Sequence, residues 1–187
     1  MTKPMPSMPI YFWGDNNFEK YHDSYFSNNS NVWTHGDWIL IDSKRGILMQ
    51  GRSDATLNRN GIRIGTSEIY MALDRLDNIK DALIIEFPIE GGVSSQLLLF
   101  VVASSPLNDK SKTEIKQHLR KQCSPRHTPD YIIPVKEIPY TISGKKMEIP
   151  VKKIFLGLPL EKVAASGAMR NPESLNAFVE IRNKMSF

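Results

Sequence analysis

An unbroken apolar run from Leu97 to Ala103 places the strongest constraint on the fold of this chain. Its seven residues fall far short of the roughly 20 that a membrane-spanning helix needs, so the run predicts a buried strand and not a span. A buried strand requires a sheet inside a hydrophobic core. The chain of 187 residues can supply one, because 41% of its residues are hydrophobic and 24% are charged, which is typical of globular proteins.

Strand and helix patterns alternate across residues 55–155, on both sides of this run. Asn60-Gly61 is a strong turn signal, because both residues tolerate the positive φ angles of a type I′ hairpin. Apolar residues then recur at helical spacing after Thr66, which can cap a helix. We therefore predict an α+β fold, in which a small mixed or antiparallel sheet packs against helices. Its expected elements are a hairpin over 55–64, helices after Thr66 and over 110–122, strands over 82–87 and 97–103, and an edge strand over 131–135 that is interrupted by Pro134.

The segments on either side of residues 55–155 have patterns of their own. Residues 1–54 are predicted to be β-rich, with a hairpin formed by strands 38–41 and 46–50. Two strands alone are marginal in water, so we expect this segment to be the C-terminal tail of a larger domain. Residues 156–187 form an extension with a short helix that Asn171 would cap. We expect the apolar faces of both flanking segments to dock on a domain outside this chain.

Charge and cysteine content narrow the class of protein. The formal net charge is +4, and residues 107–154 hold eleven Lys and Arg against five Asp and Glu. Such basic charge suits the phosphates of a nucleotide or coenzyme. Nucleic acid is the weaker interpretation, because the stretch has no aromatic platform, recognition helix or Cys/His pattern.

Cys123 is the single cysteine and the first nine residues lack the apolar core of a signal peptide, so a cytoplasmic location is expected.

Three loops carry residues suited to binding a nucleotide. Asp37 could accept both hydroxyls of a ribose, and Arg52 could donate to the same sugar or to a phosphate. Arg63 follows the Asn60-Gly61 turn, where glycine allows a close approach of the backbone. Lys145 lies in a glycine-bearing loop and could place its charge on a developing anion. The ordinary alternatives are a turn aspartate, a surface arginine and a simple turn.

A metal site would have to come from His118, Cys123 and His127. Three ligands without a cysteine pair are a poor zinc signal, and surface histidines with a buried thiol are the simpler interpretation. We therefore predict no metal ligands in this chain. Nucleophilic catalysis has no support either, because neither a nucleophile elbow nor a Ser-His-Asp order occurs.

Four motifs, taken in order, resemble the signatures of the adenylate-forming acyl-CoA synthetases. They are His35-Gly-Asp37, Gly51-Arg-Ser-Asp54, Asn60-Gly-Ile-Arg-Ile-Gly-Thr-Ser-Glu68 and Thr141-Ile-Ser-Gly-Lys145. Three further stretches, 5–15, 54–59 and 124–130, and the extension beyond Lys153 are similar to the branch of that superfamily that activates acetoacetate. The resemblance covers essentially the whole chain, but only the C-terminal part of such an enzyme.

The resemblance implies roles in forming an acyl-adenylate from acetoacetate and ATP. Asp37 would bind the ribose hydroxyls of ATP or the adenylate with help from Arg52, and Arg63 would approach phosphate. Lys145 would be the catalytic lysine that reaches the substrate carboxylate and the α-phosphate, where its charge stabilises the transition state. Mg²⁺ would be bound through ATP, with its ligands outside this chain.

The resemblance also implies a mobile lid over residues 55–155. Asp54 would be the hinge, Gly61 would line the pantetheine channel after the lid turns, and Arg126 would be a less specific candidate for the phosphates of CoA. The partner would be an N-terminal adenylation domain. This chain alone is then expected to be inactive, and its uncovered apolar faces favour self-association.

Two departures from the family pattern leave alternatives open. Asn58 stands where many members have lysine, which favours the short-acyl branch, and the stretch after Lys145 lacks the arginine that often follows. The lid of an acetyl- or propionyl-CoA synthetase is one alternative, since the acyl pocket lies outside this chain. A free-standing, non-catalytic module that binds a nucleotide or a partner is another.

Overall fold

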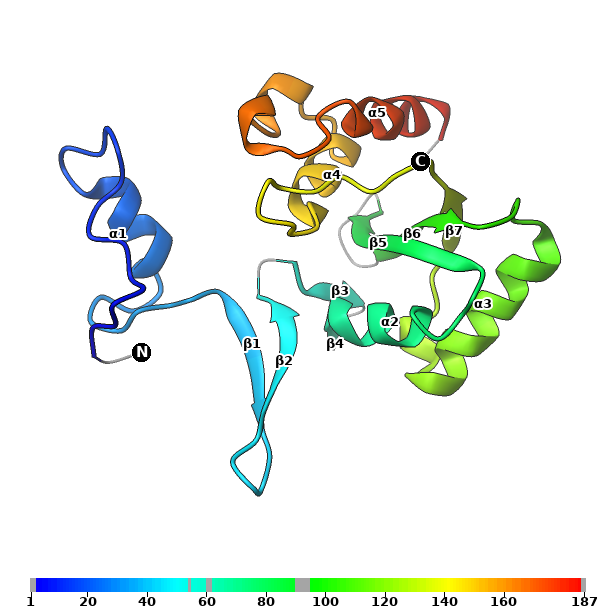
Figure 1. Cartoon of the computed structure of the whole chain (residues 1–187), viewed down its shortest axis with the longest axis horizontal. Helices are drawn as coiled ribbons and strands as arrows, with labels where there is room; N and C mark the ends of the chain where they lie inside the picture. The colour runs from blue at the N-terminus through cyan, green and yellow to red at the C-terminus, as the bar shows by residue number, and fades with distance from the viewer. Residues whose placement is uncertain (1–2, 54, 60–61, 90–94, 186–187) are drawn as a thin grey trace.

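A three-stranded mixed sheet lies at the centre of the fold (Figure 1). β5 (Ile79–Pro88) pairs antiparallel with β6 (Ser95–Ala103), and β7 (Tyr131–Pro134) pairs parallel with the other edge of β6. The predicted buried strand is therefore the central one, and the residues from Leu97 to Val101 have no exposed surface. The edge position of β7 was also predicted, and it suits Pro134, which has no N–H to donate to a further strand. The computed structural model describes residues 3–53, 55–59, 62–89 and 95–185.

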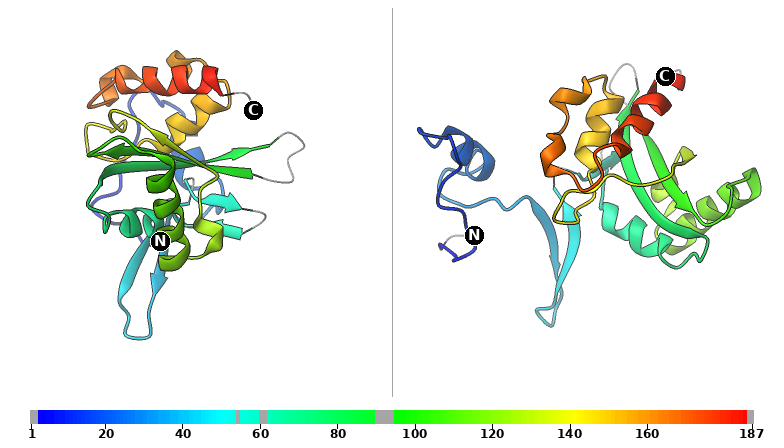
Figure 2. Two further views of the ribbon diagram at one scale, coloured as in Figure 1. Left: turned by 90° about the vertical axis from the view of Figure 1, so that its right-hand side faces the viewer. Right: turned by 45° about the horizontal axis from the view of Figure 1, so that its top comes forward.

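Each face of the sheet carries its own hydrophobic core. Successive side chains of β6 point to opposite faces, so Leu99 and Val101 enter one core while Leu98 and Phe100 enter the other. Two helices cover the first face and two cover the second, on opposite sides of the strands in Figure 2. Burial on both faces explains why the β6 sequence is continuously apolar and does not alternate. The helices are α2 (Thr66–Leu73) and α3 (Asp109–Gln122) on the first face, and α4 (Glu148–Phe155) and α5 (Ser174–Lys184) on the second.

The two helices on the first face begin in different ways. A capping box starts α3, in which the N–H of Ser111 donates to Asn108 Oδ1 at 2.9 Å and the N–H of Asn108 donates to Ser111 Oγ at 3.0 Å. The prediction that Thr66 caps α2 is wrong. Thr66 is the first helical residue and its side chain is buried, while Gly65 stands at the cap position without a side chain to accept a bond.

The C-terminal extension completes the second core. Phe178 of α5 is fully buried, with its ring centroid 4.8 Å from that of Phe100 in β6, and Leu175 is 2% exposed. The expectation that this apolar face docks outside the chain is therefore wrong, because β6 and α4 cover it. The bounds of α4 were not predicted, although Lys152 and Lys153 suggest the exposed face of a helix; Val151 and Phe155 bury its inner face.

Asn171 was predicted to cap α5, but it does not. The helix begins after Glu173, and the side chain of Asn171 reaches back to an upstream loop. Its Oδ1 accepts from the N–H of Tyr140 at 2.9 Å, and its Nδ2 donates to the carbonyl of Ile138 at 2.9 Å. Asn171 thereby joins the extension to the loop that precedes Lys145.

Two antiparallel hairpins precede the sheet, as the sequence predicted. β1 (Asp37–Ile41) pairs with β2 (Ile47–Arg52), and β3 (Leu57–Arg59) pairs with β4 (Ile62–Ile64). The Asn60-Gly61 turn lies outside the described residues. The β1–β2 hairpin projects away from the sheet in Figure 1. All seven of its large apolar side chains are at least 43% exposed: Trp38, Ile39, Leu40, Ile41, Ile47, Leu48 and Met49.

The first 36 residues contain a helix that the β-rich prediction did not anticipate. α1 (Glu19–Tyr25) belongs to an aromatic cluster around Trp33, which is 5% exposed and stacks on Tyr25 at a centroid distance of 3.7 Å. The carboxylate of Asp15 accepts from the N–H of Tyr21 at 2.8 Å and so gives a hydrogen-bond partner to a backbone N–H in the first turn of the helix.

The described residues also contain three single-turn helices: η1 (Pro125–His127), η2 (Leu160–Lys162) and η3 (Ser166–Ala168). Within the part of the chain that the structure describes, no helix is long and apolar enough to cross a membrane.

Candidate functional site

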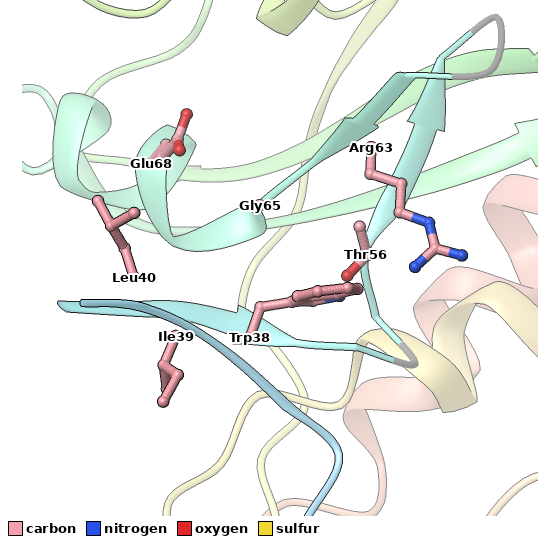
Figure 3. A pocket seen from close by; sticks show the side chains of 7 residues that line it. All are labelled: Trp38, Ile39, Leu40, Thr56, Arg63, Gly65 and Glu68. Carbon is pink, nitrogen blue, oxygen red and sulfur yellow. The ribbon is translucent and has the colours of Figure 1, made fainter. Parts of the chain in front are cut away.

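A cavity of about 430 Å³ lies between β1 and the segments that lead into α2 (Figure 3). The guanidinium of Arg63 is placed over the indole of Trp38, with Cζ 5.4 Å from the ring centroid, which is a cation–π contact. An arginine fork beside an apolar wall suits a ligand with both a phosphate and an apolar part. The lining residues are Trp38, Ile39, Leu40, Thr56, Arg63, Gly65 and Glu68.

The two predicted ribose-binding residues meet at the base of the β1–β2 hairpin, beside Trp38. Asp37 begins β1 and stands opposite Arg52, the last residue of β2, in the strand register. The Asp37 side chain is 20% exposed, and its Oδ2 lies 3.5 Å from His35 Nε2. The side chain of Arg52 lies outside what the structure describes. The backbone thus brings Asp37, Arg52 and the Trp38–Arg63 pair to one end of the hairpin.

The other predicted binding residues are not brought into this cavity. Arg126 is exposed in η1 and is not among the residues that line the cavity. Asp54, the predicted hinge, and Gly61, predicted for the pantetheine channel, lie outside the described residues. Their roles stay predictions.

Lys145 lies on a tight loop between two bridged residues, Tyr140 and Lys146. The N–H of Thr141 donates to the Lys145 carbonyl at 2.9 Å, and the N–H of Lys145 donates to Thr141 Oγ1 at 3.0 Å. Gly144 adopts a φ of +78°, which disfavours other residues. The Lys145 side chain is exposed, and it makes no hydrogen bond or ion pair with any residue that the structure describes. It can therefore engage a ligand without first breaking a contact to any of these residues.

Lys146, the next residue, points inward and joins a polar network that the sequence did not reveal. Its Nζ lies 2.7 Å from Asp81 Oδ1, donates to the Ala82 carbonyl at 2.6 Å, and lies 4.2 Å from the ring centroid of Tyr70. The other carboxylate oxygen, Asp81 Oδ2, accepts from the Tyr140 hydroxyl at 2.9 Å. The doubled lysine was the available signal, since neighbouring side chains in an extended segment point in opposite directions.

Two tyrosines act as donors in this network. The hydroxyl of Tyr70 donates to Glu148 Oε1 at 3.0 Å and accepts from the N–H of Ile84 at 3.2 Å. Burial raises the pKa of Tyr70 well above its ordinary value, and the charge of Glu148 raises it further. Burial and the hydrogen bond to Asp81 raise the pKa of Tyr140 as well. Both hydroxyls therefore keep their protons at neutral pH.

The three candidate metal ligands are engaged separately. His118 Nε2 lies 2.9 Å from the Ala72 carbonyl oxygen, and His127 Nε2 lies 2.9 Å from Glu68 Oε2. The thiol of Cys123 donates to the Glu68 carbonyl at 3.6 Å. Across residues 3–53, 55–59, 62–89 and 95–185, no group of three or more His, Cys, Asp or Glu side chains could hold a metal ion.

We predict that Cys123 is a slow nucleophile at neutral pH. Burial raises the pKa of its thiol and the charge of Glu68 raises it further, although Arg75 lowers it, so the thiolate fraction below that pKa is reduced. The rate of alkylation by iodoacetamide, followed against pH, should give a higher apparent pKa in the folded chain than in the urea-unfolded chain. An equal or lower apparent pKa in the folded chain would contradict this assignment.

Comparisons with known proteins converge on one group of enzymes, although no family model matches the chain. An acetoacetyl-CoA synthetase of Caenorhabditis elegans is 43% identical over 96% of this chain and 26% of that protein. An acetoacetyl-coenzyme A synthetase of Rhizobium meliloti is 40% identical over 99% of this chain and 28% of that protein. The solved acetoacetyl-CoA synthetase from Streptomyces lividans has a TM-score of 0.88 and 42% identity, over 99% of this chain and 28% of that one. The anthranilate CoA ligase AuaEII shares the fold alone, with a TM-score of 0.61 and 22% identity over 70% of this chain and 25% of that one.

The fold is that of the C-terminal lid portion of the adenylate-forming enzymes. Over nearly its whole length, the chain corresponds to the C-terminal portion of the acetoacetyl-CoA synthetases. It spans only 26% to 28% of the length of the curated relatives it matches. The resemblance predicted from the motifs is confirmed.

Proposed function

We propose that this chain is the lid portion of an AMP-forming acid–thiol ligase that converts acetoacetate, ATP and CoA into acetoacetyl-CoA, AMP and pyrophosphate. The observation that carries the proposal is its likeness, over nearly the whole chain, to proteins named acetoacetyl-CoA synthetase. Lys145 adds support, because it is exposed, its side chain makes no hydrogen bond or ion pair with a described residue, and backbone hydrogen bonds hold its loop in shape. Such a lysine can stabilise charge that develops on a carboxylate and a phosphate.

In this proposal the residues of the chain divide between two half-reactions. Asp37 binds the ribose hydroxyls of ATP or the adenylate, with Arg52 beside it on the paired strand. Arg63 approaches phosphate, and Lys145 reaches the substrate carboxylate and the α-phosphate. Gly61 and Arg126 serve CoA in the second half-reaction.

The proposal also divides the chain into three parts. Residues 1–54 would be the tail of the large adenylation domain, 55–155 the lid and 156–187 the extension, with the hinge at Asp54. The groups that hold the β- and γ-phosphates of ATP, and with them any Mg²⁺, would lie in the large domain. The chain without that domain should therefore not form an adenylate. The Trp38–Arg63 contact would lie at the junction, because it joins residue 38 of the tail to residue 63 of the lid.

The proposal is tested on the protein that contains this chain together with its large domain. Pyrophosphate release and thioester formation are measured with ATP, CoA and acetoacetate, acetate or propionate. We expect acetoacetate to give the highest kcat/KM. A preference for acetate or propionate would overturn the assigned acid and leave the reaction class in place. Absence of pyrophosphate release with all three acids would overturn the reaction class.

A further inference from the structure

We infer that Lys146 is a positioning residue, whose ion pair with Asp81 fixes the loop that presents Lys145. This inference rests on the proposed function, in which Lys145 acts on the substrate. Neither Lys146 nor Asp81 contacts the cavity at Trp38, so the effect would be transmitted through the loop.

Both ends of the loop are attached to one carboxylate. Tyr140 and Lys146 form an antiparallel bridge that closes residues 141–145 into the loop. The Tyr140 hydroxyl lies 2.9 Å from Asp81 Oδ2, and Lys146 Nζ lies 2.7 Å from Asp81 Oδ1. Asp81 belongs to β5, so the central sheet sets the position of the loop.

The inward direction of Lys146 determines the outward direction of Lys145. The two residues are adjacent, and side chains alternate across an extended segment. Lys146 Nζ has two oxygen partners and the face of the Tyr70 ring within reach, whereas Lys145 has no partner among the described residues. Exchanging the two side chains would expose the Lys146 charge and leave Asp81, whose side chain is 24% exposed, without its cation. That cost favours the observed arrangement.

A second set of contacts fixes the outer side of the same loop. Thr141 is bridged to Met169, and the N–H of Ile142 donates to the Ala168 carbonyl at 3.1 Å. These are contacts of the backbone with the C-terminal extension. The carboxylate of Asp81 therefore supplies the side-chain anchor on one side, and the extension supplies a backbone anchor on the other.

The test uses the protein that contains this chain and its large domain, with Lys146→Met, which keeps an unbranched apolar side chain out to Cε and removes the charged ammonium group. We expect kcat for acetoacetyl-adenylate formation to fall roughly 10- to 100-fold, the scale of a small misplacement of a catalytic group. Thioester formation from preformed adenylate should change by less than about 2-fold, because Lys145 is not used there. Adding Lys146→Met to Lys145→Ala should cause little further loss, since both would act through one charge. Lys146→Arg should recover part of the loss.

The matched control is Lys152→Met. Lys152 is also half-buried and ion-paired, with Nζ 3.1 Å from Glu86 Oε2, but it lies in α4 away from the loop. Both half-reactions should be unchanged in this variant. Hydrogen exchange gives a readout that does not depend on activity. The amides of Gly144 and Lys145 should exchange faster in Lys146→Met, while those of β6 stay protected.

The possible outcomes separate this inference from the proposed function. Normal adenylation and normal exchange at Gly144 and Lys145 in Lys146→Met would overturn it. Equal losses in both half-reactions, accompanied by a lower Tm, would show a merely structural role and would also overturn it. If Lys146→Met does not fold, Tyr140→Phe is tested by the same criteria, because it removes the hydroxyl that donates to the Asp81 carboxylate. An inactive wild-type protein would defeat the proposed function alone, because the exchange experiment would still test the loop.

Discussion

Replacing Lys145 with alanine, in the protein that carries this chain with its large domain, is expected to lower adenylate formation by about 100-fold or more. That is the scale of removing one group that stabilises a transition state. The side chain is exposed and has no partner among the described residues, so the substitution leaves the surrounding structure intact. Pyrophosphate release dependent on acetoacetate measures the effect. Thioester formation from preformed adenylate should survive, because in the proposed function the lid turns Lys145 away before the thiol enters.

Lys162→Ala is the matched control for this prediction. Lys162 is an exposed lysine of η2, in the extension. Both half-reactions should be unchanged in the control, and the stability of both variants should equal that of the wild type. Equal losses in the two half-reactions of Lys145→Ala would contradict a lysine that acts in adenylation alone.

Phe178→Ala is expected to destabilise the chain by about 3–5 kcal/mol, the range for removing a buried phenylalanine. The ring is fully buried and packs against Phe100 of the central strand, so the extension contributes to the same core as the sheet. Urea unfolding followed by far-UV circular dichroism measures the free energy of unfolding.

Glu180→Ala, two residues further along α5, is the control, because Glu180 is exposed. Its effect should stay within about 0.5 kcal/mol. A loss below about 1 kcal/mol for Phe178→Ala would mean that the extension folds separately from the core, as an appendage.

Local patterns predicted the sheet well, because they report burial directly. Leu97 to Ala103 could only be a strand covered on both faces, and Pro134 could only tolerate an edge. The hairpins were predicted from another local signal, the residues that their turns need, such as Asp42 and Gly46. Asp42 Oδ1 accepts from the N–H of Gly46 at 2.7 Å, and this bond lies within the turn itself.

Contacts between distant segments were the part that local patterns could not predict. Asn171 has the residue type and spacing of a helix cap, but its side chain binds the backbone of Tyr140, 31 positions away. The direction of Lys146 depends on Asp81, 65 positions away. The motifs identified Asp37, Arg63 and Lys145 as candidate site residues without these contacts, because each motif is short and continuous, and their roles stay predictions.

The exposed apolar side chains of the β1–β2 hairpin have a consequence for how its strand pairing is specified. In a sheet with one buried face, a shift of the strand pairing by one residue would turn the apolar side chains towards solvent, and that energetic penalty fixes the register. Here Ile39 and Ile41 point one way and Leu40 the other, and all three are exposed, so a slip carries no such penalty. Among the described residues, the turn around Asp42 and the backbone ladder specify the pairing, together with the contacts that one end of the hairpin makes with Arg63 and α2. A surface that covers the hairpin would therefore choose its inner face. Polar substitutions at Ile39 and Leu40, which are similarly exposed in this chain, would then become unequal in cost.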